Sequence, residues 1–118
     1  MGTRMISAAE SPVHDNWKQA IVDAAESDTL VVNRHSRPSM RVLRTERSHE
    51  MDVTGEGSLP PLDQLMDLYF GGDMEAGLAF SGQVAGRIES VRPVAELLEE
   101  AWSECRGLLA ELGERASS

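Results

Sequence analysis

Two short stretches of this chain combine glycine with hydroxyl or amide side chains, which are the residue types that bind phosphate and small polar ligands. The first is the tripeptide Gly2-Thr3-Arg4, directly after Met1. Glycine lets backbone N–H groups approach a phosphate without side-chain obstruction, and the Thr3 hydroxyl adds one donor. Taken alone, however, the tripeptide favours a disordered terminus over a phosphate site.

The second stretch is SGQVAGRI at 81–88, which has small residues at positions 81, 82, 85 and 86. Small side chains at this spacing let either a ligand or another segment of backbone approach closely. The spacing alone favours close helix packing over a binding site.

Metal-binding or nucleophilic chemistry finds little support in the sequence. His14, His35 and His49 are separated by 21 and 14 residues, which matches no helical or hairpin ligand pair. Cys105 is expected on the apolar stripe of a helix, where a buried thiol behaves as a small hydrophobic group. We therefore predict no metal ligand and no catalytic residue.

The first half of the chain predicts one helix followed by two short strands. Ser11-Pro12 is a typical helix start, and apolar residues at helical spacing then predict a helix over 12–26. The β-branched run TLVV predicts a strand over 29–32. Residues 41–44 alternate and predict a second strand, with an extended loop as the alternative.

The second half is predicted to be helical after a long polar connection. Residues 45–61 are rich in turn formers and predict a mobile surface loop. A helix is expected from Leu62 to the Gly71-Gly72 pair, because four of its apolar residues share one face. A longer amphipathic helix follows Pro93, and its tail over 114–118 should fray.

Composition predicts a soluble, cytoplasmic α+β domain that is mostly helical. The 118 residues carry a net charge of −9 and a single cysteine, and they contain no apolar run of about 20 residues. The charge disfavours nucleic acid and anionic membranes as partners. We expect one incomplete domain over 1–118, with parts at 1–28, 29–61 and 62–118. Helices with apolar faces and no partner layer also predict self-association.

Several segments together resemble the C-terminal part of the nitronate monooxygenases, formerly 2-nitropropane dioxygenases. These segments are MGTRM, AESPVHDNWKQAIVDA, DTLVV, RPSMRVLR and AFSGQVAGRIESVRPVAELLEE. The resemblance implies the C-terminal end of an FMN-binding (β/α)8 barrel with lid-domain segments, in which most barrel strands are missing. Flavin-dependent enoyl-acyl carrier protein reductases share the pattern, so their family is the alternative. A non-catalytic helical remnant or interaction module is a third hypothesis.

The resemblance also implies roles for individual residues. Gly2 and Thr3, and with them Met1, correspond to a stretch that contacts the FMN phosphate, and Ser81, Gly82 and Gln83 lie on the substrate side. Such enzymes oxidise alkyl nitronates with dioxygen to a carbonyl compound and nitrite. The family's catalytic histidine lies upstream of the segment that this chain matches. We therefore expect Met1 to be an internal methionine of a longer ancestral enzyme, and the isolated chain to be inactive.

Overall fold

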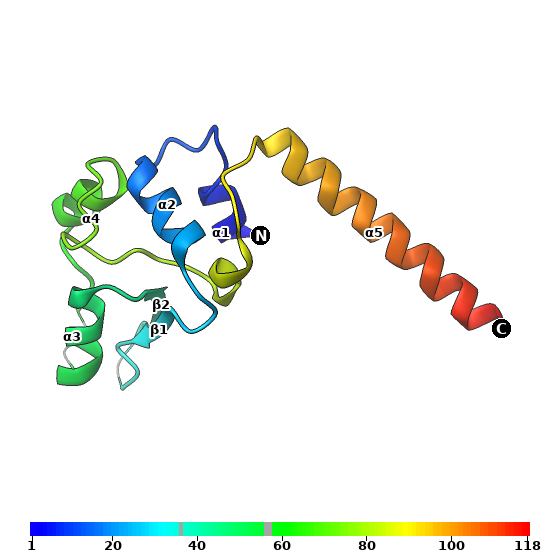
Figure 1. Ribbon diagram of the computed structural model, residues 1–118. Coiled ribbons are helices and arrows are strands. Elements are labelled where there is room, and N and C mark those ends of the chain that lie inside the picture. The colour runs from blue at the N-terminus through cyan, green and yellow to red at the C-terminus, as the bar shows by residue number, and fades with distance from the viewer. Residues whose placement is uncertain (36, 56–57) are drawn as a thin grey trace.

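The computed structural model describes residues 1–35, 37–55 and 58–118 as a helical body with one small sheet and a protruding helix (Figure 1). This agrees with the predicted mixed, mostly helical fold. No barrel is present among these residues. The elements in chain order are α1 (Gly2–Ile6), α2 (Asp15–Asp23), β1 (Thr29–Val32), β2 (Met40–Leu43), α3 (Glu46–Thr54), α4 (Leu62–Tyr69), the 3-10 helix η1 (Gln83–Arg87) and α5 (Val94–Ser117).

Strands β1 and β2 form an antiparallel pair whose register runs from Thr29 opposite Leu43 to Val32 opposite Met40. The strand predicted at 29–32 is confirmed, and the second strand lies one residue earlier than predicted. Val42 forms a further antiparallel bridge with Phe80, which brings the segment before η1 alongside the sheet.

Two clusters of buried side chains make up the core. One joins α2, α4 and η1, and the other fills the space around the sheet. Trp17 on α2, a member of the first cluster, stacks on the ring of Tyr69 on α4, and the two ring centroids are 4.6 Å apart. The first cluster consists of Trp17, Ile21, Leu43, Leu68, Ala79, Ala85 and Ile88, and the second of Leu30, Val32, Met40, Val42 and Leu78.

The first long helix starts later than its sequence suggests. Helix α2 begins at Asp15, so the predicted start with Ser11 as the cap is wrong. His14 is the capping residue, because its Nδ1 atom accepts a hydrogen bond from the Asn16 backbone N–H at 3.0 Å. The His14 backbone N–H donates to the Tyr69 carbonyl oxygen at 2.7 Å, which fixes this residue outside the helix.

The predicted loop over 45–61 contains a helix that sequence reasoning missed, α3. Thr45 and Ser48 form a capping box, in which each side chain accepts from the backbone N–H of the other residue. Gly55 ends the helix in the left-handed conformation with a φ of 74°. Residues 56–57 of the predicted loop lie outside the described residues. The helix predicted from Leu62 is confirmed as α4.

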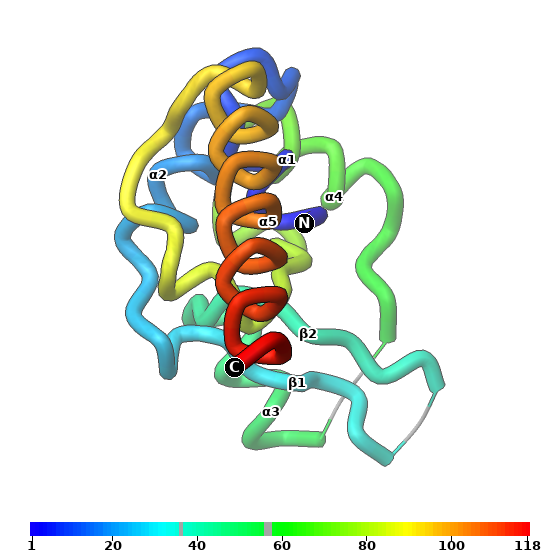
Figure 2. Tube along the Cα trace, turned by 90° about the vertical axis from the view of Figure 1, so that its right-hand side faces the viewer, coloured from blue at the N-terminus to red at the C-terminus, as the bar shows by residue number. Residues whose placement is uncertain are grey.

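Helix α5 leaves the body and makes the molecule elongated, with extents of 55 × 32 × 21 Å (Figures 1 and 2). The helix continues to Ser117, so it includes all but the last residue of the segment 114–118 that was predicted to fray. Cys105 is exposed, which corrects the prediction of a buried thiol. The reason is that the apolar stripe of α5 has no partner layer among the described residues. Across the described part of the chain, no helix is long and apolar enough to cross a membrane.

Candidate functional site

The N-terminal candidate stretch forms the short helix α1, which corrects the expectation of a disordered terminus. Met1 and Gly2 are exposed, whereas Thr3 is only 6% exposed. The first N–H groups of a helix have no carbonyl partner within it, so those of Gly2, Thr3 and Arg4 face outward along the axis. A β-carbon added to Gly2 meets no atom within 4 Å, so the space beside this residue is open.

A single hydrogen bond joins the two stretches that the sequence singled out. The Gly82 backbone N–H donates to the Thr3 Oγ1 atom at 2.8 Å, across 79 residues of sequence. Gly82 is also the residue before η1, and a β-carbon added there would lie 3.3 Å from the same oxygen. The structure therefore places Thr3 and Gly82 in one location.

Ser81 and Gln83, on either side of Gly82, lie in different surroundings. Ser81 is buried, its N–H donates to the Arg41 carbonyl oxygen at 3.2 Å, and its hydroxyl donates to the Gly82 carbonyl oxygen at 3.1 Å. Gln83 is exposed and lines an open cleft of about 440 Å³. The other residues that line this cleft are Glu26, Thr29, Arg41, Val84 and Arg87. Ser81 thus holds the loop, and Gln83 has access to solvent.

Close backbone packing, the alternative to a binding site at 81–88, is realised at Gly86. A β-carbon added to Gly86 would lie 2.6 Å from the Cα and N atoms of Glu26. Any side chain here would push η1 away from the segment that follows α2. The small residues of this stretch therefore allow two close contacts. Gly82 contacts Thr3 of α1, and Gly86 packs against the backbone of Glu26.

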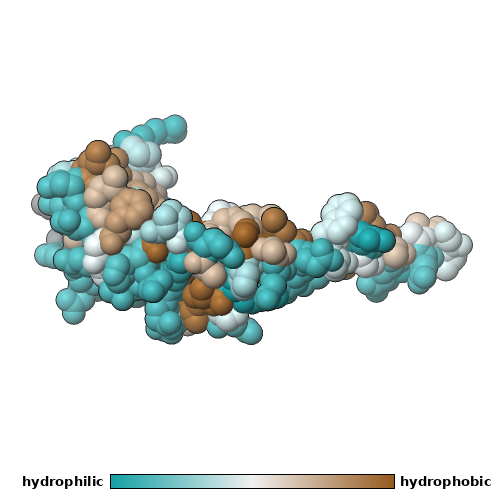
Figure 3. Space-filling model, turned by 90° about the horizontal axis from the view of Figure 1, so that it is seen from above, coloured by the Kyte–Doolittle hydropathy of each residue, from teal (hydrophilic) through white to brown (hydrophobic). Residues whose placement is uncertain are grey.

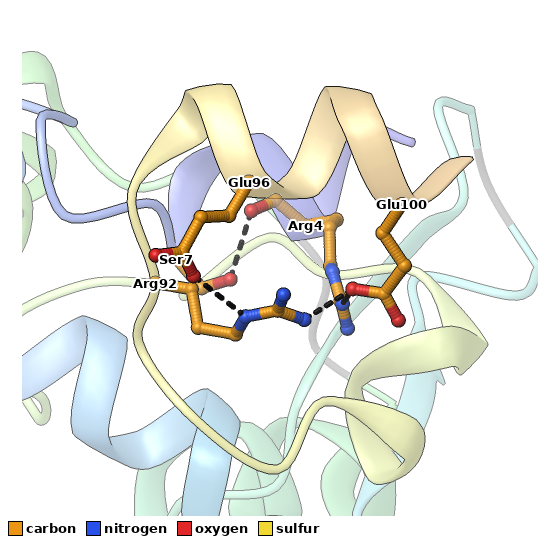
Figure 4. Close-up of polar contacts among 5 residues, drawn as sticks. All are labelled: Arg4, Ser7, Arg92, Glu96 and Glu100. Atoms are coloured by element: carbon orange, nitrogen blue, oxygen red, sulfur yellow. Dashed lines mark hydrogen bonds and ion pairs between the residues drawn. The ribbon is translucent and has the colours of Figure 1, made fainter. Parts of the chain in front are cut away.

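A network of charged residues next to α1 was not anticipated from the sequence (Figure 4). Arg4 on α1 and Arg92 before α5 both bind the carboxylate of Glu100, and the Arg4 contact is 3.5 Å long. Arg92 also binds Glu96 at 3.3 Å. The hydrogen bonds that Arg92 donates to Glu100 and then to Glu96 raise the pKa of Arg92. This network fixes the first turns of α5 against α1, and it shares Arg4 with the N-terminal candidate stretch.

The histidines have separate surroundings in the structure. His14 caps α2, and the described residues contain no group of three His, Cys, Asp or Glu side chains placed to hold a metal ion. His49 lies within α3, and His35 lies in the segment between the strands.

Two solved structures share the arrangement described above. FabK from Thermotoga maritima is 30% identical to this chain, with a TM-score of 0.82 over 95% of this chain and 38% of its own. The M276A mutant of that protein gives 32% identity and a TM-score of 0.79, over 95% of this chain and 35% of its own. This chain therefore spans little more than a third of the length of either protein.

A family model described as nitronate monooxygenase matches residues 1–104. Together the matches define the class as oxidoreductases of the FabK and nitronate monooxygenase type, whose fold is a TIM barrel. The chain belongs to the nitronate monooxygenase family. The match includes both candidate stretches and ends inside α5.

Proposed function

We propose that this chain is the C-terminal portion of an FMN-dependent enzyme that oxidises alkyl nitronates with dioxygen to a carbonyl compound and nitrite. Met1, Gly2 and Thr3 form part of the site for the FMN phosphate, and Ser81, Gly82 and Gln83 lie on the substrate side. The observation that supports this best is the hydrogen bond from Gly82 to Thr3, because it joins the two halves of the proposed site. Membership of the family supports the cofactor and the reaction class.

The residues of α1 fit a phosphate group in three respects. The N–H groups of Gly2, Thr3 and Arg4 lack acceptors within the helix, and such groups bind anions. The open space beside Gly2 leaves room for a ligand. The Thr3 oxygen accepts from Gly82 and keeps its own hydrogen to donate. The guanidinium of Arg4 is bound to Glu100, so the phosphate would be held mainly by neutral donors.

The roles that we assign to Thr3 and Gln83 follow from which of their polar groups already have hydrogen-bond partners. FMN, when bound, supplies the electron transfer to dioxygen that amino-acid side chains do not provide. Thr3 holds the 81–83 loop and can donate to the phosphate. Gln83, which is exposed, can bind a polar group of the substrate through its amide. No residue of this chain is assigned to proton transfer, so we expect the 118-residue chain alone to have no turnover.

The test is a chimera that carries the missing part of the enzyme. The segment that aligns with this chain would be replaced by residues 1–118 in two hosts, Thermotoga FabK and a nitronate monooxygenase. Nitrite release from an alkyl nitronate would be measured in the presence of FMN and compared with that of each unaltered host. We expect the nitronate monooxygenase chimera to release nitrite in a reaction that depends on both FMN and dioxygen. A nitronate monooxygenase chimera that folds and binds FMN but releases no nitrite from any alkyl nitronate would contradict the proposed reaction. The isolated chain, titrated with FMN, should show no saturable change in flavin fluorescence.

A second candidate is a flavin-dependent enoyl-acyl carrier protein reductase, which the likeness to FabK favours. The two hosts separate these candidates, because each host supplies its own catalytic residues and the graft must complete the site around them. A graft that preserves the enoyl-dependent oxidation of a nicotinamide cofactor in FabK, but abolishes nitrite release in the nitronate monooxygenase, would support the reductase.

A further inference from the structure

Helix α5 carries a continuous apolar stripe that is largely exposed to solvent. Leu98, Trp102, Leu109 and Leu112 are 53–64% exposed, and Cys105 between them is exposed as well. Positions 98, 102, 105, 109 and 112 are separated by four, three, four and three residues, the spacing of the core positions of a coiled coil. Figure 3 shows brown apolar patches along the protruding arm. We call these five residues, with Ala95, Ala101 and Leu108 beside them, the α5 stripe.

The α5 stripe lies on a different side of the helix from the contacts with the body. Leu97 is buried against the body, and Glu100 on the next turn binds Arg4 and Arg92. Leu98 is exposed although it directly follows Leu97. At about 100° per residue, positions 97 and 100 face one way, and positions 98, 102, 105 and 109 face another. A second helix can therefore lie along the α5 stripe without displacing the body.

We propose that the α5 stripe binds the α5 stripe of a second copy of this chain, with the two helices antiparallel. In this register Trp102 packs against Cys105 of the other copy, Leu98 against Leu109, and Ala95 against Leu112. The two residue numbers of each pair add up to 207, which means that all the pairs lie symmetrically about one point of the helix. A single two-fold axis through that point therefore relates all of them. The paired segment, residues 95–112, is about 26 Å long at 1.5 Å per residue.

The charges next to the α5 stripe favour the antiparallel direction. In this register Glu99 of one copy lies beside Arg106 of the other, twice by symmetry. A parallel pair would instead place Glu99 beside Val94 and Arg106 beside Ala101, so neither charge would be compensated. The remaining acidic residues lie on the outer surface of the pair, where their repulsion is screened by water and salt. They are Glu96, Glu100, Glu104, Glu111 and Glu114.

The first test is the mass of the 118-residue chain in solution, measured by sedimentation equilibrium with Cys105 kept reduced. We expect a monomer–dimer equilibrium at concentrations up to the order of 100 µM. Leu109→Glu should raise the dimer Kd at least tenfold, because it places a charge in the apolar layer of both copies. Ser103→Glu is the matched control: it adds the same charge on the outer face and should leave the Kd within about twofold.

The second test examines the direction of the helices. Glu99→Arg or Arg106→Glu alone should weaken the dimer, because each places like charges together in both pairs. The double variant Glu99→Arg, Arg106→Glu should restore it. A chain that stays monomeric over this range, or a dimer that Leu109→Glu leaves intact, would overturn the proposal. A dimer that the double variant fails to restore would overturn the antiparallel register. None of these outcomes depends on FMN, so they are independent of the proposed enzymatic function.

Discussion

The hydrogen bond between Thr3 and Gly82 leads to a prediction that can be worked out quantitatively. Thr3→Val keeps nearly the same shape and removes the hydroxyl that accepts the Gly82 N–H at 2.8 Å. Thr3 is 6% exposed, but Gly82 itself is exposed, so water can reach the N–H group in part. The loss should therefore be that of an ordinary hydrogen bond, about 0.5–1.5 kcal/mol, rather than that of a fully buried unpaired donor.

Two measurements follow from this value. The free energy of unfolding, from urea denaturation followed by circular dichroism, should fall by about 1 kcal/mol. Exchange of the Gly82 amide hydrogen, followed by NMR, should become about fivefold faster if its opening free energy falls by the same amount. Thr3→Ser is the control, because it keeps the acceptor oxygen and removes only a methyl group. If Thr3→Val and Thr3→Ser gave the same amide exchange at Gly82, the hydrogen bond would not hold the loop, and the reasoning would be refuted.

Three further predictions concern the body of the protein. Gly86→Ala should lower the free energy of unfolding by about 1–3 kcal/mol in urea denaturation, because its β-carbon would lie 2.6 Å from the Glu26 backbone; an unchanged midpoint would show that this contact is loose. Ser48→Ala should cost about 1–2 kcal/mol by the same assay, because Ser48 is buried and shares a capping box with Thr45; Ser48→Thr, which keeps the hydroxyl, should recover part of the loss. Burial raises the pKa of Tyr69 above 10.0, so below about pH 10 its hydroxyl is protonated in both folded and unfolded states. Above that pH the tyrosine of the unfolded chain ionises first, so the free energy of unfolding falls as the pH rises. A spectroscopic titration of the chain's one tyrosine at 295 nm should give a midpoint above 10.0 in the folded protein. A midpoint at or below 10.0 would contradict the burial of Tyr69.

Local signals in the sequence were sufficient where a segment's structure depends on its own residues. The run at 29–32 is a strand because four β-branched or apolar residues pair directly with β2. Helix α4 forms where its apolar face predicts it, and Gly72 follows it with a φ of 77°, a conformation that suits glycine. The family could also be predicted from the chain, because the quoted segments extend over most of the region that the family model matches.

The sequence predictions that were wrong concern segments whose structure depends on a distant contact or on a side-chain cap. Helix α2 starts at Asp15 because the His14 N–H is bound by Tyr69, far away in sequence. Helix α3 was missed because its residues are polar, and its capping box uses Ser48 in place of the usual Glu or Gln. Cys105 was expected to be buried because an apolar stripe usually faces a core; periodicity identifies the stripe but does not say what covers it.

The charged network around Glu100 could not be predicted for a related reason. Arg4 and Glu100 are 96 residues apart, and nothing in their local sequence marks them as a pair. The same holds for Thr3 and Gly82: each stretch was recognised by its composition, but only the fold shows that they meet.

The measurement that tests the central claim most directly is the FMN content of the Thermotoga FabK chimera when Gly2 is changed to a bulky residue. A β-carbon at Gly2 meets no atom within 4 Å, so Gly2→Phe should leave the fold intact and fill only the space assigned to the phosphate. The matched control is Gly107→Phe on α5, which also has open space around it. The account predicts that Gly2→Phe lowers the affinity for FMN at least tenfold, and that Gly107→Phe leaves it unchanged. Equal FMN affinity in both variants would contradict the assignment of Met1, Gly2 and Thr3 to the phosphate site.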